Sequence, residues 1–450
     1  MFHASFVESL NSAIGNTLSH TVLEALQSNA SVSIRINQHK SHLFNLDNLE
    51  RVPWCPDGYY LPQRPLFSAD PFLHLGHYYV QEASSMIVGE LVKSLLPKTE
   101  NGSLVLDLCA APGGKSTHIA SVLNPSDVLV SNEVISSRTP ILEENLAKWG
   151  VANHIVTRAD SEFWGRSGLS FDVVVADLPC SGEGMFRKDP EALQQWSLGN
   201  VELCAQRQRR IVSEVWKAIK PGGFLIYSTC TFNRKENEDN LLMMEVLPGF
   251  TPVSIQSSGL SFLIETDPHM FRALPGMVKG EGFFVSVIQK QTTEYHNQEK
   301  GKFKSFQTIT NQGLWPSGVQ SFQLGDEVFA TRCHGDLFFS TLGQLPGYHS
   351  PGVCIGKSIR NVFKPNPRLA LMCGIENSGW VRVHLSDTEV MAYLRRETLQ
   401  NPGLKSDTTL ALWKNHPVGF LSPNRNRWNN LWPMEWRLRM DAQEPESFLF

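Results

Sequence analysis

The chain has 450 residues, of which 41% are hydrophobic and 19% are charged, and its formal net charge is −4. This length exceeds what one hydrophobic core normally serves, and the composition excludes a largely disordered chain, so we expect several folded domains. The pI near 6.4 excludes the strongly basic class of nucleic-acid-binding proteins, so any contact with nucleic acid must come from local basic patches.

Residues 1–95 carry a mixed pattern and are predicted to form an N-terminal α+β domain, which we call the lead-in. It ends in the segments RVPWCPDGYYL and GHYYVQEASSMIVGELV. The start, MFHASFVESLNSAIG, has no basic flank followed by an apolar stretch, so no secretory signal is predicted. No apolar run approaches the roughly 18 residues that a membrane span needs.

Residues 96–290 alternate short apolar runs with helical patterns, which is typical of a doubly wound, Rossmann-like α/β domain with a mainly parallel sheet. The expected strands are 103–108, 127–134, 154–160, 171–179 and 222–230, with 283–290 closing one edge. The expected helices are 115–123, 138–150 and 201–219, and the last is predicted to end at Pro221, Gly222 and Gly223.

The remaining residues are polar at first and then rich in short strand-like runs with Gly, Pro and Trp. We predict a linker over 291–310, a β-rich intermediate module over 311–375 and a second small β-rich module over 376–450. We expect a monomer, since nothing in the pattern indicates a partner subunit.

The eight cysteines are too sparse for a disulfide framework, and their spacings do not suit a zinc site, so no metal is predicted. Reduced thiols in a cytoplasmic protein are the simplest interpretation. Six of the thiols are expected to serve mainly in packing: Cys55, Cys109, Cys204, Cys333, Cys354 and Cys373.

A small-residue turn follows the first expected strand in LVLDLCAAPGGKSTHIA. It would let the backbone pass close to a ligand, and the helix that starts after it would offer unpaired N–H groups. NAD and NADP are disfavoured because GxGxxG is absent. The residues predicted to bind a cofactor here are Cys109, Ala110, Ala111, Pro112, Gly113, Gly114 and Lys115.

Four acidic residues end consecutive expected strands: Asp107, Glu133, Asp160 and Asp177. Since the carboxyl ends of parallel strands share one edge, these residues are expected to line one crevice. Glu133 suits two ribose hydroxyls, and Asp160 suits an adenine amino group. The alternative is that some of them cap helices, as single aspartates often do.

Two further cysteines also follow strand ends, Cys180 in DLPCSGEG and Cys230 in YSTCTFN. Their strands are neighbours in the doubly wound order, so both thiols are expected to face the same crevice. The residues alone do not decide which of the two thiols is a nucleophile.

Several segments resemble the motifs of the Sun (Fmu) family of RNA cytosine-5 methyltransferases: LDLCAAPGGKS, DLPCSGEGMFRKDP, YSTCTFNRKENED and RALPGMVKGEGFF. RVPWCPDGYYL, YYVQEASSM and the C-terminal extension are most similar to the RsmF-like branch, which modifies bacterial small-subunit rRNA. The resemblance implies S-adenosylmethionine as cofactor and a PUA-like RNA-binding module at 376–450.

The same resemblance implies roles for the two cysteines. Cys230 is the nucleophile that adds to cytosine carbon 6, and Cys180 assists product release. The chemistry of its carboxyl group suits Asp177 to ring nitrogen 3, where a proton or hydrogen bond stabilises the adduct, and its place at a strand end suits it to the cofactor. The target base must leave its stack, so single-stranded or remodelled RNA is expected.

Five basic residues near these motifs suit either phosphate contacts or a solvated helix face: Arg187, Lys188, Arg207, Arg209 and Arg210. In the tail, arginines with Trp428, Trp432 and Trp436 suit RNA stacking, although we expect at least two of these tryptophans to fill a core. Glu236 and Glu238 are interpreted as caps of the following helix.

Three alternatives stay open. The substrate is transfer RNA, the chain is an inactive RNA-binding ribosome assembly factor, or the target is DNA. DNA is disfavoured because the STC motif would then have no role, and decayed motifs would be expected of an inactive factor.

Overall fold

The computed structural model describes residues 2–40, 44–97, 99–255, 260–291, 306–309, 313–333, 336–345, 347–360, 362–401, 407–441 and 444–448. The predicted linker at 291–310 therefore lies largely outside the described residues. Within them, no helix combines the length and the apolar character that crossing a bilayer requires.

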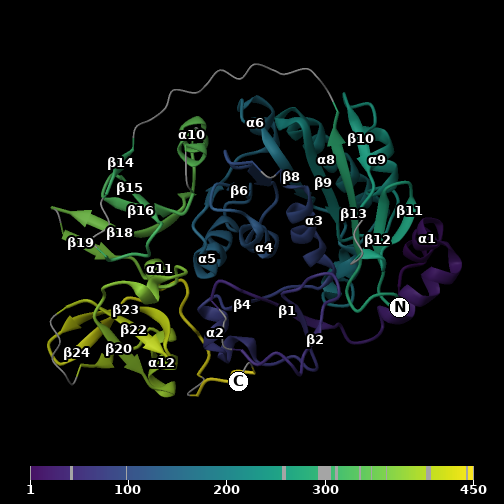
Figure 1. The fold of residues 1–450 in the computed structure, drawn as a ribbon. Helices are drawn as coiled ribbons and strands as arrows, with labels where there is room; N and C mark the ends of the chain where they lie inside the picture. The colour runs from purple at the N-terminus through teal and green to yellow at the C-terminus, as the bar shows by residue number, and fades with distance from the viewer. Residues whose placement is uncertain are drawn as a thin grey trace.

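A mainly parallel sheet forms the centre of the molecule (Figure 1). Its parallel strands lie in the order β9-β8-β5-β6-β7, and β13 pairs antiparallel with β9. The parallel strands are β5 (Leu104–Asp107), β6 (Val128–Asn132), β7 (His154–Thr157), β8 (Phe171–Asp177) and β9 (Ile219–Thr229). The antiparallel edge holds β10 (Phe250–Val253), β11 (Ile264–Asp267), β12 (Met270–Ala273) and β13 (Phe283–Lys290).

Helices cover both faces of this sheet, because successive strand residues point to opposite sides. Val105 and Leu129 pack with one helical layer, whereas Leu104 and Val128 pack with the other. The first layer includes α3 (Ile87–Leu95) and α4 (Gly114–Val122), and α5 (Thr139–Trp149) lies beside α4. The second includes α6 (Ser161–Arg166), α8 (Leu198–Val215) and α9 (Glu238–Met244), and the short α7 (Pro190–Gln195) precedes α8.

The doubly wound fold predicted from the sequence is confirmed, and each expected strand is present within a few residues of its predicted bounds. The end of the third helix was predicted wrongly. α8 stops at Val215, a single 3-10 turn follows, and β9 already begins at Ile219. Pro221 and the two glycines thus lie inside the strand, where the register with β8 shifts. Such irregularities let a strand accommodate proline and glycine.

The lead-in is a four-stranded sheet in the order β2-β3-β1-β4, preceded by a long helix. Its elements are α1 (Ala4–Ala25), β1 (Val32–Ile36), β2 (Glu50–Arg51), β3 (Gly58–Leu61), α2 (Pro71–His74) and β4 (Tyr78–Val80). α1 bends at Gly15, whose φ of 77° lies outside the helical range.

Two small sheets form the tail, at the left of Figure 1. The first holds β14 (Gln307–Thr308), β15 (Gln320–Leu324), β16 (Glu327–Thr331), β18 (Val353–Ile359) and β19 (Val362–Pro365), with α10 (Leu337–Gln344) and α11 (Pro367–Ala370) beside it. The second holds β20 (Arg382–Leu385), β21 (Leu399–Gln400), β22 (Thr409–Trp413), β23 (His416–Asn424) and β24 (Arg427–Asn430), with α12 (Asp387–Leu394).

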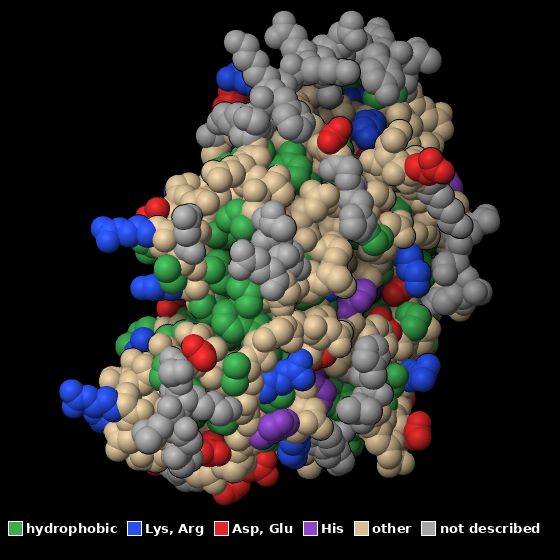
Figure 2. Space-filling view, turned by 60° about the vertical axis from the view of Figure 1, so that its left-hand side comes forward, with side chains coloured by type: hydrophobic (Ala, Val, Ile, Leu, Met, Phe, Trp, Pro, Cys, Tyr) green, Lys and Arg blue, Asp and Glu red, His purple; other side chains and the backbone are tan. Residues whose placement is uncertain are grey.

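The tail packs firmly on the other parts of the molecule. β17 (Ser350–Pro351) pairs with β7 and so extends the central sheet. One apolar cluster joins α10 to the central sheet, and another joins the second tail sheet to the lead-in. Figure 2, which brings the tail forward, shows Lys and Arg side chains projecting around apolar areas of this face. Because these contacts bury apolar surface, they hold the tail against the central sheet and the lead-in.

The three tail tryptophans lie in the core. Trp428, Trp432 and Trp436 are all buried, and the rings of the last two meet edge to face. The expectation that at least two of them fill a core is therefore confirmed, and it extends to the third. The neighbouring arginines are exposed: Arg425, Arg427, Arg437 and Arg439.

We predict that the lead-in and the tail stabilise each other through Phe72 and Trp413, whose rings lie 4.9 Å apart in a shared core. Phe72→Ala and Trp413→Ala should each lower the free energy of unfolding by about 3–5 kcal/mol in denaturant titrations. Because the two side chains touch, the double variant should lose less than the sum. Phe72→Ala combined with Trp380→Ala is the matched control and should be additive. Additive losses for the contacting pair would contradict the coupling.

Candidate active site

A cavity of about 1200 Å³ opens at the carboxyl ends of the central strands. Two of its walls belong to different domains. The central α/β domain supplies the turn after β5, together with Lys115, Asp177 and Cys230. The lead-in supplies residues of β1 and β4, including Ser33 and Tyr79. The sequence did not indicate that the lead-in forms one wall, because strand periodicity says nothing about which domain covers a sheet edge.

The turn after β5 has the geometry expected for close approach of a ligand. Cys109, Ala110, Ala111, Pro112, Gly114 and Lys115 all line the cavity. Gly113 precedes α4 with a φ of 115°, a conformation that side-chain-bearing residues rarely adopt. A Cβ on Gly114 would lie 3.3 Å from the ring of Tyr79, so the small residue keeps the space between the domains open. The unpaired N–H groups of the first turn of α4 are available to an anion.

Two of the strand-end acids have oxygen atoms without a hydrogen-bond partner. Asp107 is fully buried and accepts from Ser116 Oγ at 2.6 Å through one oxygen, while the other is unpartnered. Burial raises the pKa of Asp107 to about 7. Glu133 accepts the backbone N–H of Ile135 at 2.9 Å, and its second oxygen has no hydrogen bond, with Arg138 3.5 Å away. Buried unsatisfied acceptors are uncommon and mark a place for a ligand's donors.

The other two acids differ from this pair. Asp160 is exposed, and one of its oxygens caps α6 by accepting the N–H of Phe163 at 2.9 Å. For this oxygen, the alternative that the acids cap helices is correct. Asp177 lies in the cavity wall, 2.7 Å from the Lys115 ammonium. Although burial alone would lower it, Asp177 holds the pKa of Lys115 above its usual value. Of the four acids, Asp177 lines the cavity, whereas Asp107, Glu133 and Asp160 do not, so the expectation that all four line one crevice is wrong.

The two thiols lie close together, but Cys230 lines the cavity and Cys180 does not. Cys180 and Cys230 follow the neighbouring strands β8 and β9, and their sulfur atoms lie 3.2 Å apart. The hydrogen bond to Cys230, together with burial, raises the pKa of Cys180 well above the usual thiol value. Cys180 therefore keeps its proton, and its S–H can donate a hydrogen bond to Cys230 Sγ.

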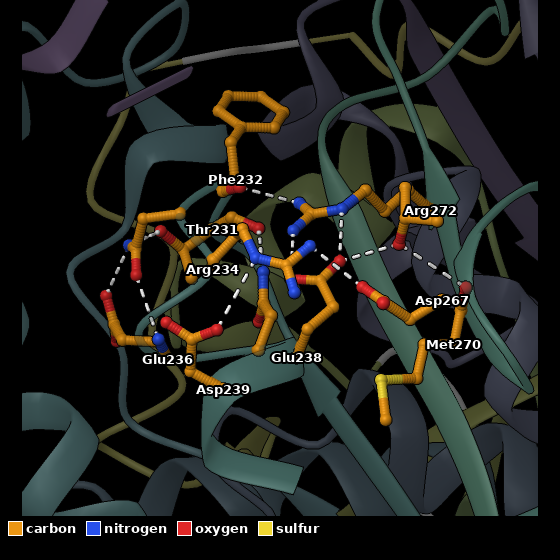
Figure 3. A network of polar contacts seen from close by, with 12 residues as sticks. Thr231, Phe232, Arg234, Glu236, Glu238, Asp239, Asp267, Met270 and Arg272 are labelled. Carbon is orange, nitrogen blue, oxygen red and sulfur yellow. Dashed lines mark hydrogen bonds and ion pairs between the residues drawn. The ribbon is translucent and has the colours of Figure 1, made fainter. Parts of the chain in front are cut away.

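Buried carboxylates surround the backbone beneath the thiols. Glu238 forms an ion pair with Arg272 at 2.6 Å, with both side chains buried, and Arg272 also donates to the carbonyl of Phe232 (Figure 3). Glu236 accepts the N–H of Ser181. The interpretation of Glu236 and Glu238 as helix caps is therefore wrong, because neither carboxylate bonds to the free N–H groups of α9.

The basic residues near the site have several roles. Arg187 joins three segments of the chain, because it forms an ion pair with Glu281 at 3.0 Å and donates a hydrogen bond to the carbonyl of Ala25. Lys188 lines the cavity. On α8, Arg209 bonds to Asn240, whereas its two neighbours in the cluster, residues 207 and 210, are exposed.

A buried group that sequence spacing did not reveal lies between the lead-in and the helical layer. Cys55, Glu90 and His118 bring their ligand atoms within 4.8 Å of one another. Burial raises the pKa of Cys55 to about 12 and lowers that of His118 to about 4. The group is thus a neutral thiol and a neutral imidazole beside one carboxylate.

Family models match three parts of the chain. The model described as 16S rRNA methyltransferase RsmB/F matches residues 93–289. The model of the N-terminal domain of 16S rRNA methyltransferase RsmF matches residues 2–83, and that of the methyltransferase RsmF PUA domain matches residues 381–438.

Solved structures share the fold of the catalytic part. A methyltransferase homolog protein from Pyrococcus horikoshii is 25% identical, with a TM-score of 0.54, over 64% of this chain and 95% of that chain. NSun6 from Pyrococcus horikoshii, solved with SFG, is 19% identical with a TM-score of 0.54 over 65% and 99% of the two chains, which indicates likeness of fold alone.

Curated relatives extend the similarity. Ribosomal RNA small subunit methyltransferase F of Shewanella loihica is 35% identical over 56% of this chain and 53% of its own length. The protein of the same name from Escherichia coli O81 is 34% identical over 96% of both chains. Because this second likeness runs through the lead-in, the central sheet and the tail, the chain belongs to the family of ribosomal RNA small subunit methyltransferases F.

Proposed function

We propose that this chain methylates carbon 5 of a cytosine in small-subunit rRNA with S-adenosylmethionine as the methyl donor. The observation that carries this proposal is the pair of thiols, 3.2 Å apart, with Cys230 in the wall of the same cavity as the glycine turn. A single nucleophile would need one cysteine. Two cysteines on neighbouring strands suit a reaction in which one thiol forms a bond and the other helps to break it.

Cys230 is proposed as the nucleophile. Carbon 5 of cytosine is too weak a nucleophile by itself, and thiolate addition at carbon 6 makes it reactive. The new bond joins Cys230 Sγ to carbon 6, and the displaced electron pair reaches ring nitrogen 3. The proton for that nitrogen comes from the Lys115 ammonium, 2.7 Å from Asp177, and the Asp177 carboxyl group relays it. The proton returns to this pair when the product is released.

Cys180 is proposed to act in release. Its thiol first donates a hydrogen bond to Cys230 and later loses its proton to solvent. The resulting thiolate accepts the proton from methylated carbon 5, the carbon 5–carbon 6 double bond re-forms, and the bond from carbon 6 to Cys230 Sγ breaks. The hydrogen bond to Cys230 that raises the pKa of Cys180 is lost once Cys230 Sγ is bonded to carbon 6, which eases the loss of the Cys180 proton before this step.

The cofactor would be held by the turn from Cys109 to Lys115 and by Glu133, Asp160 and Asp177. When bound, it supplies an electrophilic methyl group. The fit rests on the Glu133 oxygen that accepts no hydrogen bond and lies 3.5 Å from Arg138, which suits a ribose hydroxyl, and on the first turn of α4, which suits a carboxylate. The second oxygen of Asp160, beyond its capping bond, is left for an adenine amino group.

The tail is proposed to bind RNA. Its four exposed arginines, residues 425, 427, 437 and 439, suit phosphate contacts, whereas the buried tryptophans do not serve in stacking. We also propose that the chain divides at the predicted bounds 1–95, 96–290, 311–375 and 376–450, and that it acts as a monomer in the cytoplasm, where ribosomal subunits are made.

Two other functions compete with this one. A transfer-RNA methyltransferase would use the same thiols, and bisulfite sequencing of both RNA classes from a strain that lacks the gene separates the two. An inactive assembly factor is disfavoured because Asp177, Cys180 and Cys230 are all present. The two thiols lie 3.2 Å apart, and Asp177 lines the same cavity as Cys230.

For the cofactor, we predict that Glu133→Ala weakens the binding of S-adenosylmethionine because a charged acceptor is lost. Hydrogen bonds to charged groups typically contribute about 1.5–3 kcal/mol, which corresponds to a loss of roughly 10- to 150-fold in Kd. Isothermal calorimetry measures this loss. Glu162→Ala, which removes an exposed carboxylate paired with Arg166, is the control and should bind normally. Wild-type affinity in a folded Glu133→Ala protein would remove Glu133 from the site.

For the chemistry, we predict different outcomes for the two thiols. Cys230→Ala should abolish methylation but leave RNA binding intact, since no thiolate remains to attack carbon 6. Cys180→Ala should stall after bond formation and accumulate a protein–RNA adduct that survives denaturing electrophoresis.

The double variant Cys180→Ala/Cys230→Ala is the control for that experiment and should form no adduct. Cys204→Ala, a buried thiol outside the cavity, should behave as wild type. If Cys230→Ala traps RNA and Cys180→Ala does not, the two roles are exchanged. If neither variant differs from wild type, the covalent mechanism is wrong.

A further inference from the structure

The loops that carry the two cysteines are tied together by carboxylates in a reciprocal way. Glu183 belongs to the loop after Cys180, yet one of its oxygens accepts the backbone N–H groups of Phe232 at 2.7 Å and Asn233 at 2.9 Å, in the loop after Cys230. Glu236 follows Cys230, yet it accepts the backbone N–H of Ser181 at 3.0 Å, directly after Cys180. Each loop therefore holds the other.

Further contacts close the space between the loops. Asn233 donates to Glu183 at 3.1 Å and to Glu236 at 2.8 Å, so one amide links both carboxylates. The hydroxyl groups of Ser181 and Thr231, each next to a cysteine, lie 2.9 Å apart. The N–H of Gly184 donates to the carbonyl of Cys230 at 2.8 Å.

Both carboxylates are surrounded by donors. Glu183 also accepts from Trp196 Nε1 at 2.9 Å, and Glu236 also accepts from Gln208 Nε2 at 2.8 Å. The two glutamates are 1% and 0% exposed, so water does not replace a lost partner. Glutamine has the same shape but carries an NH₂ group, which would have to face an N–H donor. The N–H donors around each glutamate require a group that only accepts hydrogen bonds. An NH₂ group that faces them leaves buried donors without acceptors, which costs free energy.

A third buried carboxylate, that of Glu238, fixes the loop after Cys230 through Arg272. Arg272 on β12 donates to Glu238 through two nitrogens and to the carbonyl of Phe232 through a third, as Figure 3 shows. Phe232 is thus fixed at its carbonyl by Arg272 and at its N–H by Glu183. The backbone two residues after Cys230 has little freedom to move.

We propose that Glu183 and Glu236 are positioning residues, each of which fixes the cysteine of the opposite loop. Glu183 holds Cys230 where it attacks carbon 6, and Glu236 holds Cys180 where it reaches the proton on carbon 5. The inference rests on the proposed function, since it assigns the two carboxylates to two separate steps of that reaction.

The two steps are separable with two RNA probes. In a small-subunit rRNA transcript that contains 5-fluorocytidine, carbon 5 has no proton to lose, so the adduct persists and its rate of appearance reports attack by Cys230 alone. In the unmodified transcript, the fraction of enzyme held as adduct during turnover reports the balance between attack and release.

Glu183→Gln should slow adduct formation on the fluorinated transcript by roughly 10- to 100-fold, the range that a displaced reacting group produces. Glu236→Gln should form that adduct at the wild-type rate but accumulate adduct on the unmodified transcript, because release is slowed. Trp216→Phe is the matched control, because it removes a buried indole donor that bonds to the carbonyl of Pro248, outside both cysteine loops. It should match wild type on both probes.

Thermal unfolding and cofactor binding are measured for every variant. If a glutamine variant does not fold, Glu183→Asp and Glu236→Asp keep the charge, retract it by one methylene, and should shift the same probe in the same direction. Opposite shifts of the adduct fraction in the two variants support the proposal, because a loss of folded protein lowers both readouts together.

Parallel losses that follow thermal stability, or behaviour equal to that of Trp216→Phe, would overturn the proposal while leaving the proposed function intact. If the wild-type enzyme forms no adduct on the fluorinated transcript, the proposed function itself fails, and this inference fails with it.

Discussion

Hydrogen bonding between the parallel strands β8 and β9 is the constraint on which the site depends. The register pairs Asp177 with Ser228, so both strands end at the same level and their loops begin side by side. Parallel strands need a crossover, and α7 and α8 supply it, which leaves the loops free at the carboxyl edge. Two thiols 50 positions apart in the chain thereby come within 3.2 Å through backbone pairing, with no need for affinity between the sulfur atoms.

The polar groups around the thiols differ on the two sides of the cavity wall. Beneath the thiols, the carboxylates of Glu183, Glu236 and Glu238 are buried, and each is matched by N–H donors or by Arg272. Charge-assisted hydrogen bonds offset the cost of taking these groups out of water, and they make the loops rigid. Beside the glycine turn, Asp107 and Glu133 keep oxygens without partners. The carboxylates beneath the thiols, whose hydrogen bonds are all made, fix the positions of the two loops. The carboxylates beside the glycine turn, which have an oxygen without a hydrogen bond, are suited to bind a ligand.

The outer domains complete this arrangement by packing. The lead-in supplies one wall of the cavity, and it shares an apolar core with the second tail sheet. The first tail sheet extends the central sheet through β17. Because the tail tryptophans are buried in that shared core, they tie the tail to the lead-in, while the exposed arginines are left to meet a polyanion.

The sequence by itself determined the order of strands and helices, the glycine turn and the placement of Cys180 and Cys230 at strand ends. These features are local, since periodicity, turn residues and β-branched runs act over a few neighbouring positions. Only the tertiary structure decided which side chains meet: Lys115 with Asp177, Glu236 with Ser181, Arg187 with Glu281, and the lead-in with the cavity. A buried charge takes its partner from whichever segment the fold brings within about 3 Å, and no short-range pattern encodes that choice.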